Sequence, residues 1–444
     1  MNLESQGDQA RPTAAGLGGD FLVAWADQRT GAGDIYATVV RGGQPGTSFR
    51  VNDDGGSTFQ TSPVAASVRE RAFLVWEDMR RGDFDIYSSS TADGGVWSAN
   101  VRVNDDAGTA WQRSPALAVD PTGRLLAVWT DFREGDPEIR FSASADGGAT
   151  WGDGIPDTDV RVDDAPTGAL LTAPAIAAGP SEVYVVWKDD RNGPWDIFLS
   201  VSRNGGLTWS PGLKVNDDTG FQDQGEPVIL ADSDHLYVAW TDLRRGNPDI
   251  YYTFSEDRGA TIGDGLPNSD IRINDDRRGA AQIRPALVQG LGGELLAAWE
   301  DDRTGHYDIF LSRSTDGGRT WGDGLENEND EKANDDTGST DQTDVAAAWT
   351  SQGLLVVWED RRNGEADSYA EFWPGQGGGP DGGANDPDRT ALILAGLLVI
   401  AALPVAVVLL RRRIRARRSS QPSEGPRRGR AGQPTRNRRR KRFR

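Results

Sequence analysis

The sequence contains no cysteine and only two histidines, His235 and His306. Without cysteine the chain can form neither disulfide bonds nor a thiolate metal site, so nothing about its redox compartment follows from bridges. Two isolated histidines without a thiolate partner also exclude an ordinary structural zinc site. The function must therefore be inferred from other features.

Basic residues are scarce over most of the chain. The net charge is -20, although residues 411–444 contain 16 Lys and Arg residues and a single acid, Glu424. Residues 1–410 are therefore strongly acidic. An acidic surface repels phosphate backbones, which argues against nucleic acid as a partner and favours solubility or cation binding.

The chain is organised by a repeat. A Trp-x-Asp-x-Arg core returns roughly every 50–60 residues, a period that indicates a solenoid, a propeller or an array. An acidic residue follows each core tryptophan after a constant interval. The seven pairs are Trp25 and Asp34, Trp76 and Asp85, Trp129 and Glu138, Trp187 and Asp196, Trp240 and Asp249, Trp299 and Asp308, and Trp358 and Asp367.

Each unit is predicted to contain four short strands. In unit 3, residues 116–119 and 124–129 are apolar and flank an Asp-Pro-Thr-Gly turn, residues 138–144 alternate, and residues 160–162 form a fourth strand. Four antiparallel strands with an apolar second strand are typical of a β-propeller blade. We therefore predict an all-β, seven-bladed β-propeller over residues 1–373.

The turn between the third and fourth strands carries a further motif. Residues 144–151 are Ser-Ala-Asp-Gly-Gly-Ala-Thr-Trp, and residues 314–321 are Ser-Thr-Asp-Gly-Gly-Arg-Thr-Trp. Both resemble the Asp-box of sialidase-like propellers, and units 2, 4 and 5 contain variants of it. The aspartate is expected to accept hydrogen bonds from turn amides, the glycines to take positive φ, and the tryptophan to pack on the strands.

A second phrase, Val-Asn-Asp-Asp or a close variant, closes six of the seven units. It lies at residues 51–54, 103–106, 162–164, 215–218, 273–276 and 333–336. In a propeller this connection shares one face with the Trp-x-Asp-x-Arg loop. Because both motifs recur in nearly every unit, we expect their aspartates and arginines to pair and to hold neighbouring blades together.

The resemblance implies sialidase chemistry, which uses an arginine triad, a tyrosine–glutamate pair and an aspartate. This set is not evident, because Arg11 and Arg284 precede prolines at ordinary first-strand starts. Tyr252 and Tyr307 lack a distinctive glutamate partner. Catalytic members of the family are six-bladed, which is the alternative fold.

We therefore predict no catalytic residues. The favoured function is a ligand-binding module for a glycan or an envelope protein, or a scaffold. The alternative function is that of an exo-sialidase or another glycoside hydrolase on the same fold.

The insertions of units 3 and 5 suggest calcium. Residues 153–159 and 264–270 are similar to the loops of calcium-binding thrombospondin type 3 repeats. Closely spaced side-chain oxygens and a glycine are what Ca²⁺ requires. The predicted ligands are Asp153, Asp157, Asp159, Asp264, Asn268 and Asp270. The alternative interpretation is that these are plain acidic turns.

The C-terminal part predicts a membrane anchor. Residues 374–390 are rich in Gly, Pro and Asp and are expected to form a flexible linker. Residues 391–410 carry no charge and are long enough to span a bilayer as a helix. The basic residues 411–444 then place this tail in the cytoplasm and the propeller outside the cell, and we expect the tail to be disordered.

The N-terminus also gives rise to an expectation. Unit 7 has three predicted strands and no Val-Asn-Asp-Asp phrase, and residues 1–19 do not form a secretory signal. In closed propellers the missing outer strand commonly comes from the other terminus. We therefore expect that the complete gene encodes a signal peptide and a short strand upstream of Met1.

Overall fold

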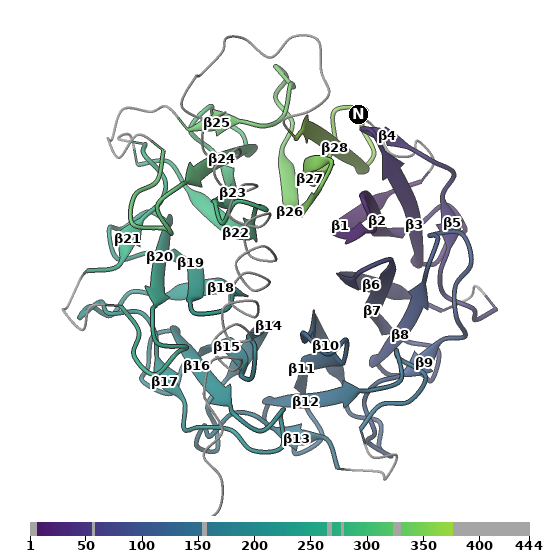
Figure 1. The fold of residues 1–444 in the computed structure, drawn as a ribbon, viewed down its shortest axis with the longest axis horizontal. Helices are drawn as coiled ribbons and strands as arrows, with labels where there is room; N and C mark the ends of the chain where they lie inside the picture. Colours follow the sequence, from purple (N-terminus) through teal and green to yellow (C-terminus); the bar gives the residue numbers. More distant parts are fainter. Residues whose placement is uncertain are drawn as a thin grey trace, which may run out of the picture. The chain divides into compact units, whose positions relative to one another are not determined.

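The computed structural model describes residues 7–55, 58–152, 158–263, 269–276, 279–322 and 330–375. These residues form seven antiparallel sheets arranged as blades around a central axis (Figure 1). The prediction of an all-β, seven-bladed propeller is confirmed, and the six-bladed alternative is wrong. Within the described ranges no helix is long and apolar enough to cross a membrane. The predicted span at 391–410, the calcium ligands Asp153, Asp157, Asp264 and Asn268, and most of the predicted linker lie outside them.

The strands follow one another from the axis outward in each blade. Blade 1 consists of β1 (Gln9–Leu17), β2 (Asp20–Asp27), β3 (Asp34–Arg41), β4 (Gln44–Pro45) and β5 (Phe49–Arg50). Blade 2 consists of β6 (Gln60–Val68), β7 (Arg71–Asp78), β8 (Asp85–Thr91) and β9 (Val101–Arg102). Blade 3 consists of β10 (Gln112–Val119), β11 (Leu125–Asp131), β12 (Glu138–Ser144) and β13 (Val160–Arg161). Blade 4 consists of β14 (Leu171–Ala178), β15 (Val183–Asp189), β16 (Asp196–Ser202) and β17 (Leu213–Lys214).

The remaining three blades complete the ring. Blade 5 consists of β18 (Gln224–Ala231), β19 (Leu236–Asp242), β20 (Asp249–Ser255) and β21 (Ile271–Arg272). Blade 6 consists of β22 (Gln282–Gln289), β23 (Leu295–Asp301), β24 (Asp308–Ser314) and β25 (Glu331–Lys332). Blade 7 has three strands in the described residues, β26 (Gln342–Thr350), β27 (Gly353–Asp360) and β28 (Asp367–Pro374).

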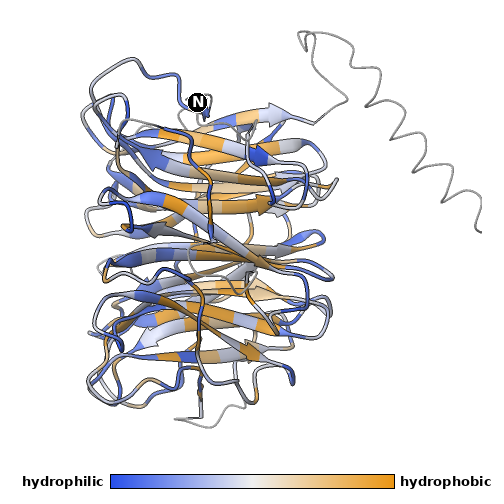
Figure 2. Ribbon diagram, turned by 90° about the vertical axis from the view of Figure 1, so that its left-hand side faces the viewer, coloured by the Kyte–Doolittle hydropathy of each residue, from blue (hydrophilic) through white to orange (hydrophobic). Residues whose placement is uncertain are grey.

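The hydrophobic core is divided among the seven interfaces between blades. Each cluster joins the second strand of one blade to that of its neighbour, and the interface of blade 7 with blade 1 packs Leu355 and Val357 against Phe21 and Val23. β1 contacts both β6 and β26, so the ring is closed. Figure 2 shows that the strongly hydrophobic residues lie mostly in the strands, whereas hydrophilic residues are common in the loops.

Every innermost strand is interrupted near its start. The pairing between first and second strands shifts register there in all seven blades. At the shift each strand places a non-glycine residue at positive φ, a conformation that costs roughly 1–2 kcal/mol for a residue with a Cβ. These seven residues, named the axial ring below, are Arg11, Ser62, Ser114, Ala173, Glu226, Arg284 and Asp344.

The turns predicted as Asp-boxes are built as expected in blade 3. Thr150 donates its backbone N–H to Asp146 at 2.9 Å, and Gly148 donates to Ser144 Oγ at 2.9 Å. Gly147 has a φ of 76°, and the Trp151 side chain is buried. These residues shape the turn and cover the edge of the blade core, which is a structural role.

Candidate functional site

The repeated core is a fixed hydrogen-bonded unit. In blade 3 the Trp129 indole N–H donates to Asp131 at 2.8 Å, and Asp131 also binds the Arg133 guanidinium at 2.8 Å. Trp129 and Asp131 are completely buried. The other six blades repeat the Trp–Asp bond. The aspartate therefore orients the arginine of its own blade.

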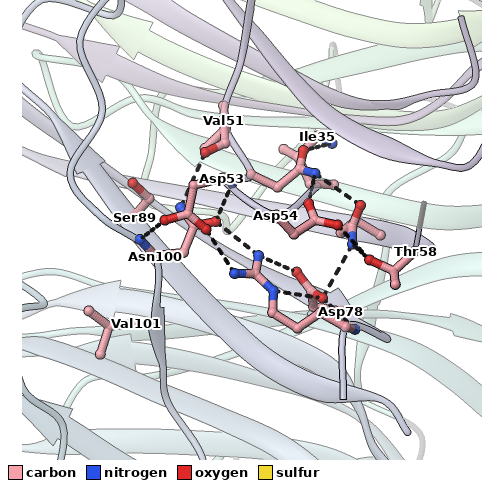
Figure 3. Close-up of polar contacts among 12 residues, drawn as sticks. Ile35, Val51, Asp53, Asp54, Thr58, Asp78, Ser89, Asn100 and Val101 are labelled. Carbon is pink, nitrogen blue, oxygen red and sulfur yellow. Dashed lines mark hydrogen bonds and ion pairs between the residues drawn. The ribbon is translucent and has the colours of Figure 1, made fainter. Parts of the chain in front are cut away.

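That arginine reaches the preceding blade. Figure 3 shows the contact between blades 1 and 2, here called a joint, in which Asp53 of blade 1 and Asp78 of blade 2 lie near each other. Arg80 bridges the two, at 2.8 Å from Asp53 and 2.8 Å from Asp78. Asn100 completes the joint by accepting a bond from the Asp53 backbone N–H at 2.8 Å and by donating to Val51 O at 3.2 Å.

Five further joints use the same residues of the repeat. The pairs are Arg133 with Asp105, Arg191 with Asp164, Arg244 with Asp217, Arg303 with Asp275, and Arg362 with Asp335. The prediction that the two motifs share one face and join neighbouring blades is confirmed. This face, which carries the joints, is called the upper face below. Its repeated residues form a scaffold rather than a site.

Two of the predicted calcium ligands take part in these joints. Asp159 accepts from the Asp105 backbone N–H at 2.9 Å and from Arg133 at 3.0 Å. Asp270 contacts Asp217 and Arg244 in the same way. Among the described residues no group of three or more His, Cys, Asp or Glu residues could hold a metal ion. The calcium site itself stays a prediction.

Burial perturbs both of these carboxyl groups. Burial, and the hydrogen bond to the Asp105 carboxylate, raise the pKa of Asp159 to about 8. The same causes, with Asp217 as the neighbour, raise the pKa of Asp270 to about 8. The raised pKa favours the protonated form of Asp159 and of Asp270, which lowers the repulsion from the neighbouring aspartate.

The residues that differ from blade to blade gather around the axis of the upper face. The axial ring holds charged, polar and apolar side chains at one and the same repeat position. Two neighbouring pairs in the ring are in contact: Arg11 donates a hydrogen bond to Ser62 Oγ, and Arg284 lies 3.8 Å from Asp344. A site that is special to part of the ring must be built from such residues.

Buried glutamates hold arginines beside the axial ring. Glu77 binds Arg113 Nε at 2.7 Å, and Glu300 binds Arg284 Nη1 at 3.3 Å. The side chains of Glu77 and Glu300 are 2% and 0% exposed, whereas those of Arg113 and Arg284 are 32% and 48% exposed. The glutamates therefore fix the position of guanidinium groups that are open to solvent, and they partly offset the positive charge of these groups.

Blade 7 contains a third pair of this kind. Glu359 binds Arg361 Nη2 at 2.7 Å, with the glutamate buried and the arginine exposed. All three glutamates lie between the Trp and the Asp of the repeated core, where the other blades have Ala26, Thr130, Lys188 and Thr241. Two of the glutamates also accept the backbone N–H of an axial-ring residue in the next blade, Glu77 from Ser114 at 2.8 Å and Glu300 from Asp344 at 2.7 Å.

Glu300 and Tyr307 both have a raised pKa. Burial raises the pKa of Glu300 to about 7, even though Arg284 opposes the shift. Burial and the negative charges of Asp302 and Glu300 raise the pKa of Tyr307. A nucleophilic tyrosine needs the opposite shift. The negative charge of Glu300 therefore acts on Tyr307, although the sequence had indicated no glutamate partner for this tyrosine. This charge disfavours the phenolate.

The sequence analysis placed Arg284 and Arg11 correctly at the starts of first strands. It did not predict that both belong to the axial ring or that Glu300 binds Arg284. The sequence did contain a sign of the glutamate–arginine pairs: the residue between the core Trp and Asp is acidic in three units only. Its partner in the next blade could not be identified without the register of the strands.

Sequence comparison finds relatives among sialidases. The chain is 24% identical over 243 residues to a sialidase of Clostridium perfringens, covering 47% of this chain and 60% of that protein. It is 22% identical over 352 residues to a sialidase of Bacteroides fragilis (strain YCH46), covering 71% of this chain and 58% of that protein. The chain thus spans less than two thirds of the length of either relative. No family model matches.

These relatives support the sialidase-like propeller superfamily. A solved structure with a similar fold is a polysaccharide lyase of family PL25, an ulvan lyase bound to -[GlcA(1-4)Rha3S]-. It superposes with a TM-score of 0.58 at 10% identity and covers 84% of this chain and 96% of that one. The two relatives are thus sialidases, and a polysaccharide lyase shares the fold of this chain.

Proposed function

We propose that the upper face binds an acidic glycan beside the axial ring. The observation that carries this proposal is the set of buried glutamates that fix exposed arginines, above all Glu300 with Arg284. Blades 6, 7 and 1 are consecutive. Blades 6 and 1 supply Arg284 and Arg11 at the axial-ring position, where the other five blades have no basic residue. Blade 7 supplies Arg361 directly after the core aspartate, where no other blade has a basic residue. Planar guanidinium groups bind carboxylates and sulfates in two-pronged geometry.

Binding is favoured over catalysis by the burial of the glutamates. Glu77, Glu300 and Glu359 are each engaged by an arginine and covered, so they position cations rather than exchange protons with a substrate. A glycoside hydrolase is the second candidate, because the sequence relatives are sialidases and Tyr307 lies on the upper face near Glu300.

The experiment compares acidic and neutral sugars. The purified full-length chain is applied to an array of sialylated, uronic, sulfated and neutral glycans, and galacturonic acid binding is then titrated. We expect binding of acidic glycans that weakens with salt and is lost in Arg284→Met. Arg258→Met, which removes an equally exposed arginine paired with the exposed Asp234, is the control and should change nothing. Equal binding of neutral glycans would contradict the proposal.

The hydrolase candidate has its own measurement. Release of a fluorescent product from a sialoside by the wild type, and its loss in Tyr307→Phe, would replace binding by catalysis as the function.

We also propose that the propeller is displayed on the cell surface. The support is the uncharged segment 391–410 followed by the basic residues 411–444, which lie outside the described residues. Protease treatment of intact cells should degrade the propeller and leave the C-terminal tail intact; the reverse pattern would refute this orientation.

A further inference from the structure

One repeat position of the upper face is apolar and exposed in three successive blades. It directly precedes the innermost strand, and its carbonyl accepts a hydrogen bond from the residue after the core aspartate, as Trp111 does from Phe132 at 3.0 Å. The position holds Phe59, Trp111 and Leu170, which are 39%, 50% and 49% exposed. The other four blades have Asp8, Asp223, Ala281 and Asp341 there.

The aspartates at this position have a structural task. Asp8, Asp223 and Asp341 each accept a backbone N–H from the loop of the preceding blade, at 3.1, 3.0 and 3.1 Å. A phenylalanine or tryptophan cannot accept such a bond. The aromatic residues at 59 and 111 therefore do not take over this task, and their partial exposure leaves part of each side chain open to a ligand.

The exposed rings are supported from below. The buried Phe84 packs edge-to-face against Phe59 at 6.3 Å and against Trp111 at 5.9 Å. The Arg113 guanidinium lies 4.1 Å from the centre of the Phe84 ring and 5.9 Å from that of Trp111. Arg113 is the arginine that Glu77 fixes beside the axial ring. Phe59, Phe84, Trp111 and Arg113 are here called the aromatic arc. They lie together on blades 2 and 3 of the upper face, and Arg113 adjoins the axial-ring residue Ser114.

A hollow opens next to this arc. Its volume is about 610 Å³, and it is lined by the residues just before Trp111 in the chain, by two arginines and by two acidic residues. They are Gly108, Thr109 and Ala110, then Arg133 and Arg140, and then Asp106 and Glu134. The hollow is therefore polar, carries charged groups of both signs, and reaches the residue next to Trp111 in the chain.

We infer that the aromatic arc is a second glycan subsite, which holds the continuation of a chain whose acidic residue binds beside the axial ring. This inference rests on the proposed function. Sugar rings present apolar C–H faces that pack on aromatic rings, and their hydroxyls and carboxylates bind a neighbouring guanidinium. The ligand is therefore an oligosaccharide rather than a single sugar.

The size of the arc favours a glycan over a protein. Phe59 and Trp111 are at most half exposed, and an aromatic side chain buries only about 150–250 Å² in full. A stable protein interface needs about 800 Å² from each partner. A few sugar rings match the smaller area.

The test uses the full-length chain in detergent and two probes, galacturonic acid and its linear octamer. Calorimetry should show that the octamer binds more tightly than the monomer. Phe59→Asp with Trp111→Asp installs the residue that other blades use, so the fold is kept. We expect this variant to lose about tenfold or more of its octamer affinity while its monomer affinity is unchanged. Leu291→Ala, an exposed apolar residue in the turn after β22, should leave both affinities unaltered.

Each other outcome has a definite meaning. If monomer and octamer bind equally, or the aspartate variant keeps the octamer affinity, the second subsite is overturned and the acidic-glycan site stands. If neither probe binds, the proposed function fails and the subsite fails with it. If the variant instead changes the sedimentation coefficient, the arc is a contact between copies of the chain and the inference is wrong.

Discussion

Asp159 Oδ2 lies 3.0 Å from Arg133 Nη2, and in blade 2 the side-chain oxygen of Asn100 takes the same position at 2.9 Å from Arg80. Both oxygens also accept a backbone N–H from the Val-Asn-Asp phrase of the preceding blade. The repeat therefore tolerates an amide or a carboxyl group at this point, although only the carboxyl group can titrate.

This equivalence predicts that Asp159→Asn is well tolerated. At pH 7 we expect the free energy of unfolding to change by less than about 1 kcal/mol, since Asn preserves both accepted hydrogen bonds. The pH dependence should change more. The folded-state pKa of about 8 is above that of the unfolded chain, so the folded state binds an extra proton and stability falls as pH rises from about 4 to 8. Melting temperatures across this range should decline less in the variant.

The reverse substitution provides the control. Asn100→Asp should introduce the same decline of stability with pH, and an unchanged pH profile would contradict the assignment of the effect to this position.

A second prediction concerns the arginines of the joints. Arg133 is 8% exposed and faces three carboxyl groups, of which Asp131 and Asp159 are almost fully buried. Arg133→Met removes the charge and keeps the apolar stem, leaving these groups uncompensated, so we expect a loss of about 3–5 kcal/mol in urea unfolding. Arg362→Met should cost less, because Arg362 has one buried carboxylate partner among the described residues, Asp360, while its other partner, Asp335, is 85% exposed and is hydrated without the arginine. Equal losses would argue against burial as the cause.

A third prediction concerns the buried core tryptophans. Trp129→Phe removes the indole N–H that Asp131 accepts and leaves a small cavity, since both side chains are fully buried. We expect a loss of about 2–4 kcal/mol, measured by the midpoint of denaturant unfolding. A change below about 1 kcal/mol would show that Arg133 alone satisfies the aspartate.

A fourth prediction concerns the closure of the ring. The Gln9 side-chain oxygen accepts the Ser368 backbone N–H at 3.0 Å. In the other six blades an Asn or Asp just after the outer strand accepts the equivalent N–H, as Asn216 does from Ile197. Gln9→Ala should cost about 1–3 kcal/mol, because it strands a buried N–H. Gln224→Ala, which leaves the Asn216 bond to Ile197 in place, is expected to cost less in the same thermal unfolding experiment.

The repeat made much of the architecture predictable. A motif that recurs at fixed spacing determines the number of blades, and its alternation of apolar residues places the strands, so unit 3 differed from expectation mainly in that β10 begins at Gln112 instead of residue 116. The pairing of Arg with Asp across blades also followed from recurrence, since residues found in every unit must serve the contact between units.

The candidate site was not predictable in the same way. Glu300 and Asp344 are 44 residues apart in the chain and meet only because β26 lies beside β22 and β23 in the ring. The residue types of Glu300 and Asp344 did not distinguish them from other acidic residues. Arg11 and Arg284 each precede a proline, as the residues at the same position of most other blades do. The aromatic arc was equally hidden, because the exposure of Phe59 and Trp111 depends on the neighbouring blade.

The last prediction links Glu300 to ligand binding. Burial raises the pKa of Glu300 to about 7, so the carboxylate that pairs with Arg284 becomes neutral as pH falls through 7. A protonated Glu300 still accepts hydrogen bonds from Arg284 and from the backbone N–H of Asp344, so the guanidinium stays in position while the glutamate no longer offsets its charge. Affinity for galacturonate should therefore increase several-fold between pH 8 and pH 6. In Glu300→Gln the carboxyl group is replaced by a neutral amide, so binding should be tight and nearly independent of pH over this range, whereas Glu256→Gln, a change at an exposed carboxyl group beside Arg319, should retain the wild-type profile. A wild-type affinity that stays constant from pH 8 to pH 6 would show that Glu300 does not control the charge available at Arg284.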